Sequence, residues 1–175
     1  MSVLHSNACF CYHKKMNSTP LSSFNNKILC IGNVSVDIKA YSPESDGTEA
    51  YREGSIELVP GGVARGMAIN LKHLGFDTCV SSVVGHDIFG TYLRDGLNLE
   101  NVDTTLLRTS ERRETSLFSV MSSANKSATC VYSTAILSEI VFDEKTIAFI
   151  EENDIKVFVL DSNLSEDRSE EHTSE

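Results

Sequence analysis

The feature that most constrains the fold is a set of short strand-like runs without regular polar alternation. They are Ile28–Ile31, Thr78–Val84 and Ile155–Leu160. Such runs are typical of strands that are covered on both faces, as in a parallel sheet. Residues 63–74 and 88–97, which precede and follow the second run, carry apolar side chains at helical spacing. This alternation of strand and helix predicts parallel βαβ units and therefore an α/β fold.

The pattern changes in the second half of the chain. Thr104–Arg108, Thr115–Ser122 and Ala128–Tyr132 are short β-rich runs separated by polar turns. They predict an antiparallel patch inserted into the parallel architecture. Asp143 then stands where it can cap a helix that precedes the last buried run.

The composition restricts the classes of partner. A chain of 175 residues fits one domain, and its formal net charge of -10 argues against a nucleic-acid surface, which needs clustered Lys and Arg. No apolar run approaches membrane-spanning length. The five cysteines have neither CxxC nor zinc-finger spacing, which favours reduced thiols and a cytoplasmic location.

Residues 1–26 are expected to be a disordered leader. They are rich in Ser, Asn and Cys, contain no Asp or Glu, and show no periodicity. The absence of acidic residues and the pair Lys14-Lys15 would suit an organelle-targeting peptide, although Arg is also absent. An extended translation start, with Met16 as the true one, is an equal alternative.

A glycine pair, Gly61-Gly62, follows Pro60 and precedes the first helical segment. Proline cannot extend a sheet ladder, so we expect the preceding strand to end there. The helix that follows presents free backbone N–H groups beside the two glycines, and such a corner can bind a ligand close to the main chain. The alternative is a tight loop with no ligand.

Asp37 follows the first buried run by a few residues. Open α/β sheets bind ligands at the carboxyl ends of their strands, so a carboxylate there can accept hydrogen bonds from substrate hydroxyls. A solvated Asp at a strand end is the alternative.

These segments, in this order, resemble the N-terminal half of the ribokinase-like sugar kinases, the PfkB family. The resemblance covers residues 27–164 and rests on the run from Ile28 to Asp37, on Gly61-Gly62, and on Val83–Gly90. Gly-Gly-Val-Ala-Arg followed by Asn-Leu-x-x-Leu-Gly looks most like the pseudouridine kinases within that family. The resemblance implies a truncated Rossmann-type three-layer sandwich with a mostly parallel sheet and an inserted antiparallel β-lid.

The resemblance also implies functional residues. Asp37, Gly61 and Gly62 would bind the substrate, and Asn163 lies in a run that fits the same group. Gly66 stands where the family has an Asn that hydrogen-bonds sugar hydroxyls, which weakens the site. The family's Gly-x-Asp-x-x-Gly element falls on three residues, namely Gly85, Asp87 and Gly90.

The activity implied by the resemblance is ATP-dependent, Mg²⁺-assisted phosphorylation of a sugar or nucleoside hydroxyl. The family's Gly-Ala-Gly-Asp element, which supplies the catalytic base and holds the transferring phosphate, is absent from this sequence, as is a Walker-type loop. We therefore assign no catalytic residue and no metal ligand to the chain, and expect it to bind ATP and Mg²⁺ poorly. The alternative is a non-catalytic fragment that binds sugar weakly or forms a homodimer through the β-lid.

Residues 165–175 are expected to be a non-native polar tail. Residues 168–175, Arg-Ser-Glu-Glu-His-Thr-Ser-Glu, show no periodicity and read as the translation of a common short-read sequencing adapter. A solvated acidic terminus is the alternative. With the tail set aside, the chain is expected to be truncated near residue 164.

Overall fold

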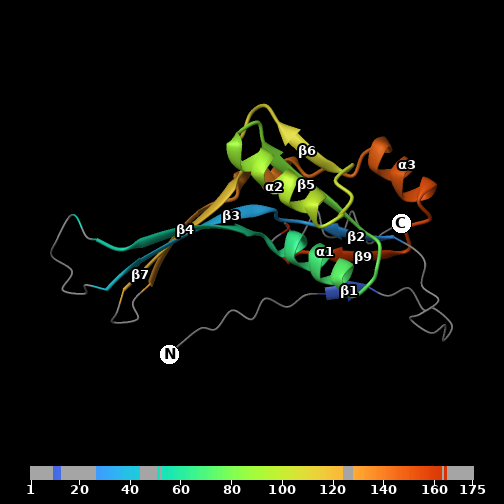
Figure 1. Cartoon of the computed structure of the whole chain (residues 1–175). Helices are drawn as coiled ribbons and strands as arrows, with labels where there is room; N and C mark the ends of the chain where they lie inside the picture. Colours follow the sequence, from blue (N-terminus) through green and yellow to red (C-terminus); the bar gives the residue numbers. More distant parts are fainter. Residues whose placement is uncertain are drawn as a thin grey trace.

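The computed structural model describes residues 10–12, 27–43, 51, 53–123, 128–162 and 164. Its larger sheet has five strands in the order β1-β9-β2-β5-β6, and a second sheet has four strands in the order β4-β3-β7-β8 (Figure 1). The strands of the larger sheet are β1 (Phe10–Tyr12), β9 (Val157–Leu160), β2 (Ile28–Ile31), β5 (Thr78–Gly85) and β6 (Leu107–Ser110).

The larger sheet is parallel except at one edge. β2 pairs in parallel with both β5 and β9, and β6 pairs in parallel with β5. β1 pairs antiparallel with β9, so Phe10–Tyr12 form a strand inside the segment expected to be a disordered leader. The expectation is wrong at these three residues, because an edge strand such as β9 offers unpaired backbone groups that another strand can satisfy.

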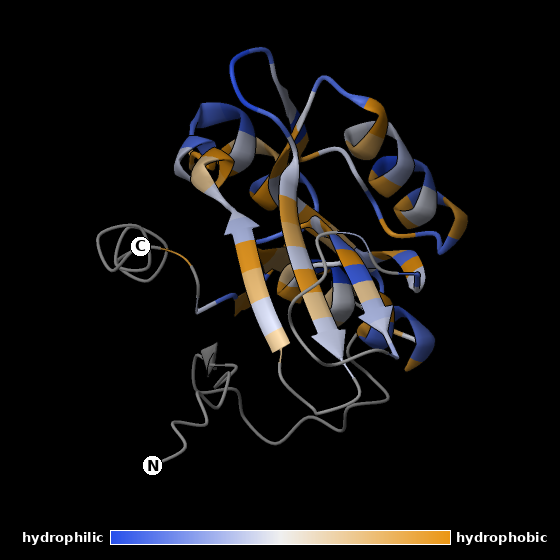
Figure 2. Ribbon diagram, turned by 90° about the vertical axis from the view of Figure 1, so that its left-hand side faces the viewer, coloured by the Kyte–Doolittle hydropathy of each residue, from blue (hydrophilic) through white to orange (hydrophobic). Residues whose placement is uncertain are grey.

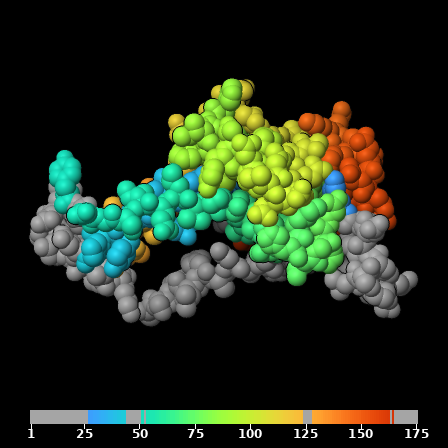
Figure 3. Space-filling model, viewed as in Figure 1, coloured from blue at the N-terminus to red at the C-terminus, as the bar shows by residue number. Residues whose placement is uncertain are grey.

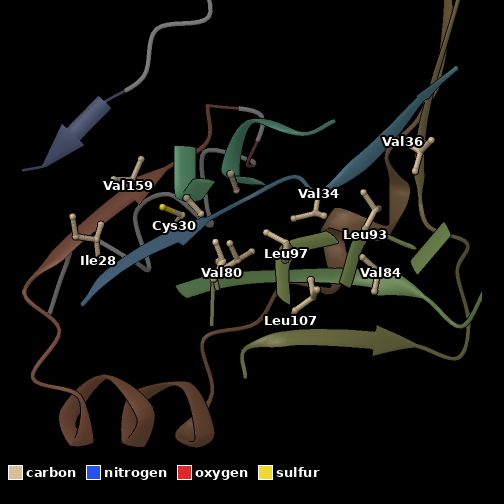
Figure 4. Close-up of a cluster of buried hydrophobic side chains, with 13 residues drawn as sticks. Ile28, Cys30, Val34, Val36, Val80, Val84, Leu93, Leu97, Leu107 and Val159 are labelled. Carbon is tan, nitrogen blue, oxygen red and sulfur yellow. The ribbon is translucent and has the colours of Figure 1, made fainter. Parts of the chain in front are cut away.

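Helices cover both faces of this sheet, which confirms the three-layer arrangement. On one face, Ala64 and Ala68 of α1 (Val63–His73) and Leu93 and Leu97 of α2 (Ile88–Leu99) pack on alternate residues of β2 and β5 (Figure 4). On the other face, the intervening strand residues pack against η2 (Ala135–Glu139) and α3 (Glu144–Glu152). Burial on both faces explains why these strands show no polar alternation in the sequence.

Local signals fix the helix ends. Gly75 has a φ of +91°, its N–H donates to the carbonyl of Lys72, and the N–H of Phe76 donates to Leu71, which is the Schellman arrangement. Asp143 accepts a hydrogen bond from the N–H of Thr146 and caps α3, as predicted. The bidentate contact from Arg108 on β6 to the Asp143 carboxylate attaches this helix to the larger sheet.

The second sheet projects from the body of the molecule (Figure 3). Its strands are β4 (Ser55–Gly61), β3 (Ser35–Ser42), β7 (Ser116–Ser123) and β8 (Ala128–Ser133). β3 pairs antiparallel with β4 but parallel with β7, and β7 pairs antiparallel with β8. The second sheet is therefore mixed, whereas the sequence predicted a purely antiparallel patch.

Two further expectations about this region are wrong. The run Thr104–Arg108 contributes to β6, in the larger sheet, because its apolar residues Leu106 and Leu107 are buried there. The strand before the glycine pair continues through Pro60 to Gly61. Pro60 is tolerated because β4 is an edge strand of the second sheet.

Within the described residues, no helix is long and apolar enough to cross a membrane.

Candidate functional site

Asp37 and Gly61 come together where β3 and β4 pair. Asp37 lies in β3 opposite Val59, two positions before Gly61 on β4. The Asp37 carboxylate occupies the space where a side chain at Gly61 would begin, since an added Cβ would lie 2.8 Å from the Asp37 Cγ. Real Cβ atoms do not approach other atoms this closely, so the half-buried carboxylate depends on the glycine at this position.

Gly62 places the start of α1 against the connection between β2 and β3. Its φ is +97°, a conformation that favours glycine, and an added Cβ would lie 2.7 Å from the Cα of Val34. Gly62 is the N-cap residue of α1, and among the described residues no side chain caps this end. The backbone N–H groups of the first turn therefore stand beside the glycine pair, as the sequence predicted.

Gly66 lies in the first turns of α1, and its N–H donates to the carbonyl of Gly62 over 3.0 Å. No described atom lies within 4 Å of a Cβ placed at Gly66. A side chain would fit there, so steric crowding does not explain the glycine at this position.

Asn33 and Asp161, which the sequence reasoning did not select, lie at the carboxyl edge of the larger sheet. The backbone N–H of Asn33, just after β2, donates to Oδ2 of Asp161, just after β9, over 3.0 Å. Asn33 is 3% exposed, and its Oδ1 has no hydrogen-bond partner among the described residues. The signal was present, because both residues follow buried parallel strands, where such sheets place their ligands. Asn163 falls outside the described residues, so its role stays a prediction.

Arg65 also approaches this corner. Its Nη1 donates to the carbonyl of Pro60 over 3.0 Å. Burial lowers the pKa of its guanidinium, and electrostatic interactions with Tyr92, Glu100 and Asp37 act in the opposite direction. The guanidinium thus adds positive charge within the electrostatic range of the Asp37 carboxylate.

Asp87 joins three segments. Its carboxylate accepts hydrogen bonds from the N–H of Gly90 (2.7 Å) at the start of α2, and from the N–H (2.8 Å) and hydroxyl (2.7 Å) of Thr115. The Thr115 hydroxyl also accepts from the N–H of Gly85 at the end of β5 (2.9 Å). Since Thr115 precedes β7, this cluster fixes the base of the second sheet to the larger one.

The three residues of the Gly-x-Asp-x-x-Gly element therefore act together as a structural joint. An added Cβ at Gly85 would lie 2.6 Å from the backbone nitrogen of Thr115, and one at Gly90 would collide with the Gly85 carbonyl. Burial alone would raise the pKa of Asp87, but the hydrogen bonds from Thr115 and Gly90 outweigh it and hold that pKa below its usual range.

A mostly parallel sheet between helical layers, with a second sheet that carries a carboxylate beside a glycine pair, defines an α/β protein of the ribokinase-like class. The pfkB family of carbohydrate kinases matches residues 25–174, and the chain belongs to this family. The match confirms the resemblance noted from the sequence. It also takes in residues 165–174, for which the expectation of a non-native tail stays a prediction.

Curated relatives match shorter stretches. The chain is 36% identical over 75 residues to pseudouridine kinase from Escherichia coli (strain K12), which is 43% of this chain and 24% of that protein. It is 29% identical over 90 residues to probable fructokinase-7 from Arabidopsis thaliana, which is 51% of this chain and 25% of that protein. The matched part is thus about a quarter of the length of each relative.

Solved structures support the fold. A putative sugar kinase from Clostridium perfringens superposes with a TM-score of 0.62 at 18% identity, covering 74% of this chain and 40% of the other. The nucleoside kinase of Methanocaldococcus jannaschii, an archaeal member of the ribokinase family, gives 0.55 at 21% identity, covering 62% and 36%. At these identities the likeness establishes the ribokinase-like fold alone.

Proposed function

We propose that this chain supplies the substrate-binding part of an ATP-dependent kinase that phosphorylates a hydroxyl group of a sugar or a nucleoside. The main support for the proposal is the position of the Asp37 carboxylate, which packs against Gly61 near the N-terminus of α1. Family membership supplies the class of reaction. A small-molecule substrate and a cytoplasmic location belong to the same proposal.

The corner has the chemistry that polyols need. An ionised carboxylate accepts hydrogen bonds from two hydroxyl groups at once, and these charge-assisted bonds are stronger than neutral ones. The glycine pair lets a ring approach the main chain, because no Cβ stands in its way. The first-turn N–H groups of α1 can then donate to substrate oxygens, so donors and acceptors lie around the same small volume.

The described residues fit ATP and Mg²⁺ less well than they fit a sugar or nucleoside. The sequence contains neither a Gly-Ala-Gly-Asp element nor a Walker-type loop. Among the described residues, no group of three or more His, Cys, Asp or Glu side chains could hold a metal ion. We therefore derive no phosphoryl-transfer step through these residues. In the proposal, ATP, Mg²⁺ and the catalytic base belong to a part of the protein beyond this chain.

The alternative function is a non-catalytic module that binds sugar weakly or dimerises. It is favoured by the same lack of a phosphate-binding element in the sequence. Neither function predicts phosphate transfer by the 175-residue chain alone, because the proposal assigns the nucleotide site and the base to a part beyond it. ATP-dependent phosphate transfer by a longer protein that joins this chain to a Gly-Ala-Gly-Asp element, measured as ADP release with a panel of sugars and nucleosides, separates the two functions. Transfer above the rate without substrate would exclude the non-catalytic alternative.

Replacing Asp37 tests the substrate site directly. Asp37→Asn should raise the Kd for any bound sugar or nucleoside at least tenfold, about 1.4 kcal/mol, because a charge-assisted acceptor is lost. The melting temperature should change little, since the half-buried carboxylate is not part of either apolar core. Calorimetric titration with ribose, fructose, uridine and pseudouridine measures this.

The matched control is Asp95→Asn, which removes a carboxylate from an exposed position of α2. It should leave every affinity unchanged. Equal affinities for the wild-type and Asp37→Asn proteins would remove Asp37 from the site, and the proposed function would lose its main support.

A further inference from the structure

The two faces of the second sheet differ, and strand alternation decides which residues share a face. Val36 is fully buried in the cluster that contains Leu93 and Leu97 of α2. Asp37, the next residue, therefore points to the opposite face of the sheet, here called the Asp37 face. The strands of this sheet lie nearest the viewer in Figure 2 and carry both hydrophilic and hydrophobic segments.

On the Asp37 face, one row of residues crosses the whole sheet. Asp37 pairs in register with Phe118 of β7, and Phe118 pairs in register with Tyr132 of β8. Registered neighbours point to the same face, so the carboxylate and the two aromatic rings stand side by side. Neighbouring strands lie about 4.8 Å apart, which places Tyr132 roughly 10 Å from Asp37 along the row.

The two rings form a stacked pair that remains open on one side. Their centroids are 5.5 Å apart and their planes differ by 20°. Tyr132 is 66% exposed, so most of its surface is available for a further flat group. A cross-strand aromatic pair also stabilises a sheet, and that role alone would require no exposed ring.

The neighbouring row, on the same face and nearer the larger sheet, supplies hydroxyl groups. Ser35 and Ser116 pair in register and are 1% and 0% exposed. Neither hydroxyl has a hydrogen-bond partner among the described residues. Buried hydroxyls without partners are costly, so an internal water molecule at this place would be stabilising, whereas a ligand on the open part of the face would not reach side chains with so little exposure.

We infer that the Asp37 face binds a nucleoside, with ribose hydroxyls at Asp37 and the base stacked on Phe118 and Tyr132. A nucleoside consists of a polyol, the ribose, joined by one bond to a flat aromatic base. The ribose matches the Asp37 carboxylate, and the base matches the aromatic rings of Phe118 and Tyr132, which lie one and two strands away. A free sugar would use the Asp37 end of the row only. This inference rests on the proposed function and specifies its substrate class.

The test is calorimetric titration of the 175-residue chain with uridine, pseudouridine and ribose. A nucleoside should bind about tenfold more tightly than ribose, since stacking on an aromatic side chain is worth about 1–3 kcal/mol per base, a factor of roughly 5–150. Tyr132→Ala and Phe118→Leu should weaken nucleoside binding about tenfold and change ribose binding less than twofold. Asp37→Asn should weaken both ligands.

Tyr41→Ala is the matched control. Tyr41 is also exposed and lies on the Asp37 face, but it is four residues, roughly 13 Å, further along β3. Its removal should leave both affinities unchanged. If a variant fails to fold, chemical shifts of the Tyr132 ring protons in the wild-type chain provide the same test, because uridine should move them and ribose should not.

Equal affinities for ribose and nucleosides, or an equal effect of Tyr132→Ala on both, would overturn the inference and leave the proposed function intact. Loss of ribose and nucleoside binding through Asp37→Asn, with no effect of the aromatic substitutions, would do the same. A wild-type chain that binds neither ligand would overturn both proposals.

Discussion

Gly61 and Gly66 are the same residue type in opposite surroundings. Gly61 lies against the Asp37 carboxylate, which leaves no room for a Cβ, whereas a Cβ at Gly66 meets no described atom within 4 Å. Gly61 is therefore required by its neighbour, while Gly66 leaves room in the first turns of a helix. The sequence alone does not distinguish a glycine that a neighbouring side chain requires, such as Gly61, from a glycine at a position with room for a side chain, such as Gly66.

Alanine at each position should shift stability in opposite directions. Gly61→Ala should destabilise the chain by about 1–3 kcal/mol, because the Asp37 carboxylate or the β4 backbone must move. Gly66→Ala should stabilise it by roughly 0.5–1 kcal/mol, because alanine has the higher helix propensity and fits without a clash. Urea unfolding of both variants checks this, and a stabilised Gly61→Ala variant would contradict the contact with Asp37.

The sequence predicted the glycine corner but not its contact with Asp37. The start of α1 directly after the glycine pair follows from local propensity and was predicted correctly, although the strand before it runs on to Gly61. The contact across the β3/β4 pair depends on strand register, and register is set by tertiary packing. Asn33 and Asp161 meet for a similar reason, since their strands become neighbours only when β2 and β9 pair.

At the scale of elements, the structural joint around Asp87 links α2, β5 and the base of β7. A single carboxylate accepts three hydrogen bonds there, two from backbone N–H groups and one from the Thr115 hydroxyl. Its loss should affect the α2 N-terminus and the attachment of the second sheet together. The structural joint therefore both caps α2 and connects the second sheet to the larger sheet.

Asp87→Asn should destabilise the chain by about 1–2 kcal/mol, the usual size for losing a capping carboxylate. The folded-state pKa of Asp87 lies below its unfolded value near 4, so its contribution is present above about pH 4 and is lost as pH falls through the folded pKa. The stability difference between the wild type and Asp87→Asn should therefore shrink on acidification. Urea unfolding across this pH range measures it, and a pH-independent difference would exclude a role for the carboxylate charge.

Three strands of the larger sheet, β2, β5 and β9, were predictable, because burial on both faces removes polar alternation from the sequence, whereas β1 and β6 were not assigned to this sheet. Membership of the second sheet was harder to predict. Residues 104–108 are as short and β-rich as the strands of the second sheet, and only their burial against the larger sheet distinguishes them. In β3, Val36, Ile38 and Ala40 alternate with polar residues, a signal of a half-buried strand that the sequence reasoning did not use.

At the scale of the whole molecule, the face of the second sheet opposite Asp37 is apolar and exposed. Its outer residues are Ile56 and Leu58 of β4, Met121 of β7 and Val131 of β8, which are 54–74% exposed. A contiguous apolar patch of this kind is typical of a contact surface. A second copy of the chain, packed face to face, is the partner that we propose for it.

Ile56→Glu should therefore weaken self-association without lowering the melting temperature, because Ile56 is 74% exposed within one chain. Sedimentation equilibrium over a range of protein concentrations measures the dimer constant. Tyr41→Ser, on the other face of the same sheet, is the control and should leave it unchanged. A wild-type chain that stays monomeric throughout would contradict the proposed dimer.

The parallel pairing of β3 with β7 has a consequence for how such a sheet can arise. The sheet is assembled from two separate stretches, residues 35–61 and residues 116–133, whose described strands are joined by the pairing of β3 with β7. Each stretch alone would make a two-stranded hairpin, which is marginally stable in water. A single insertion into a plain α/β ancestor could therefore have added only half of it. The two hairpins had either to be inherited together or to be gained in succession, with the second stabilised by the first.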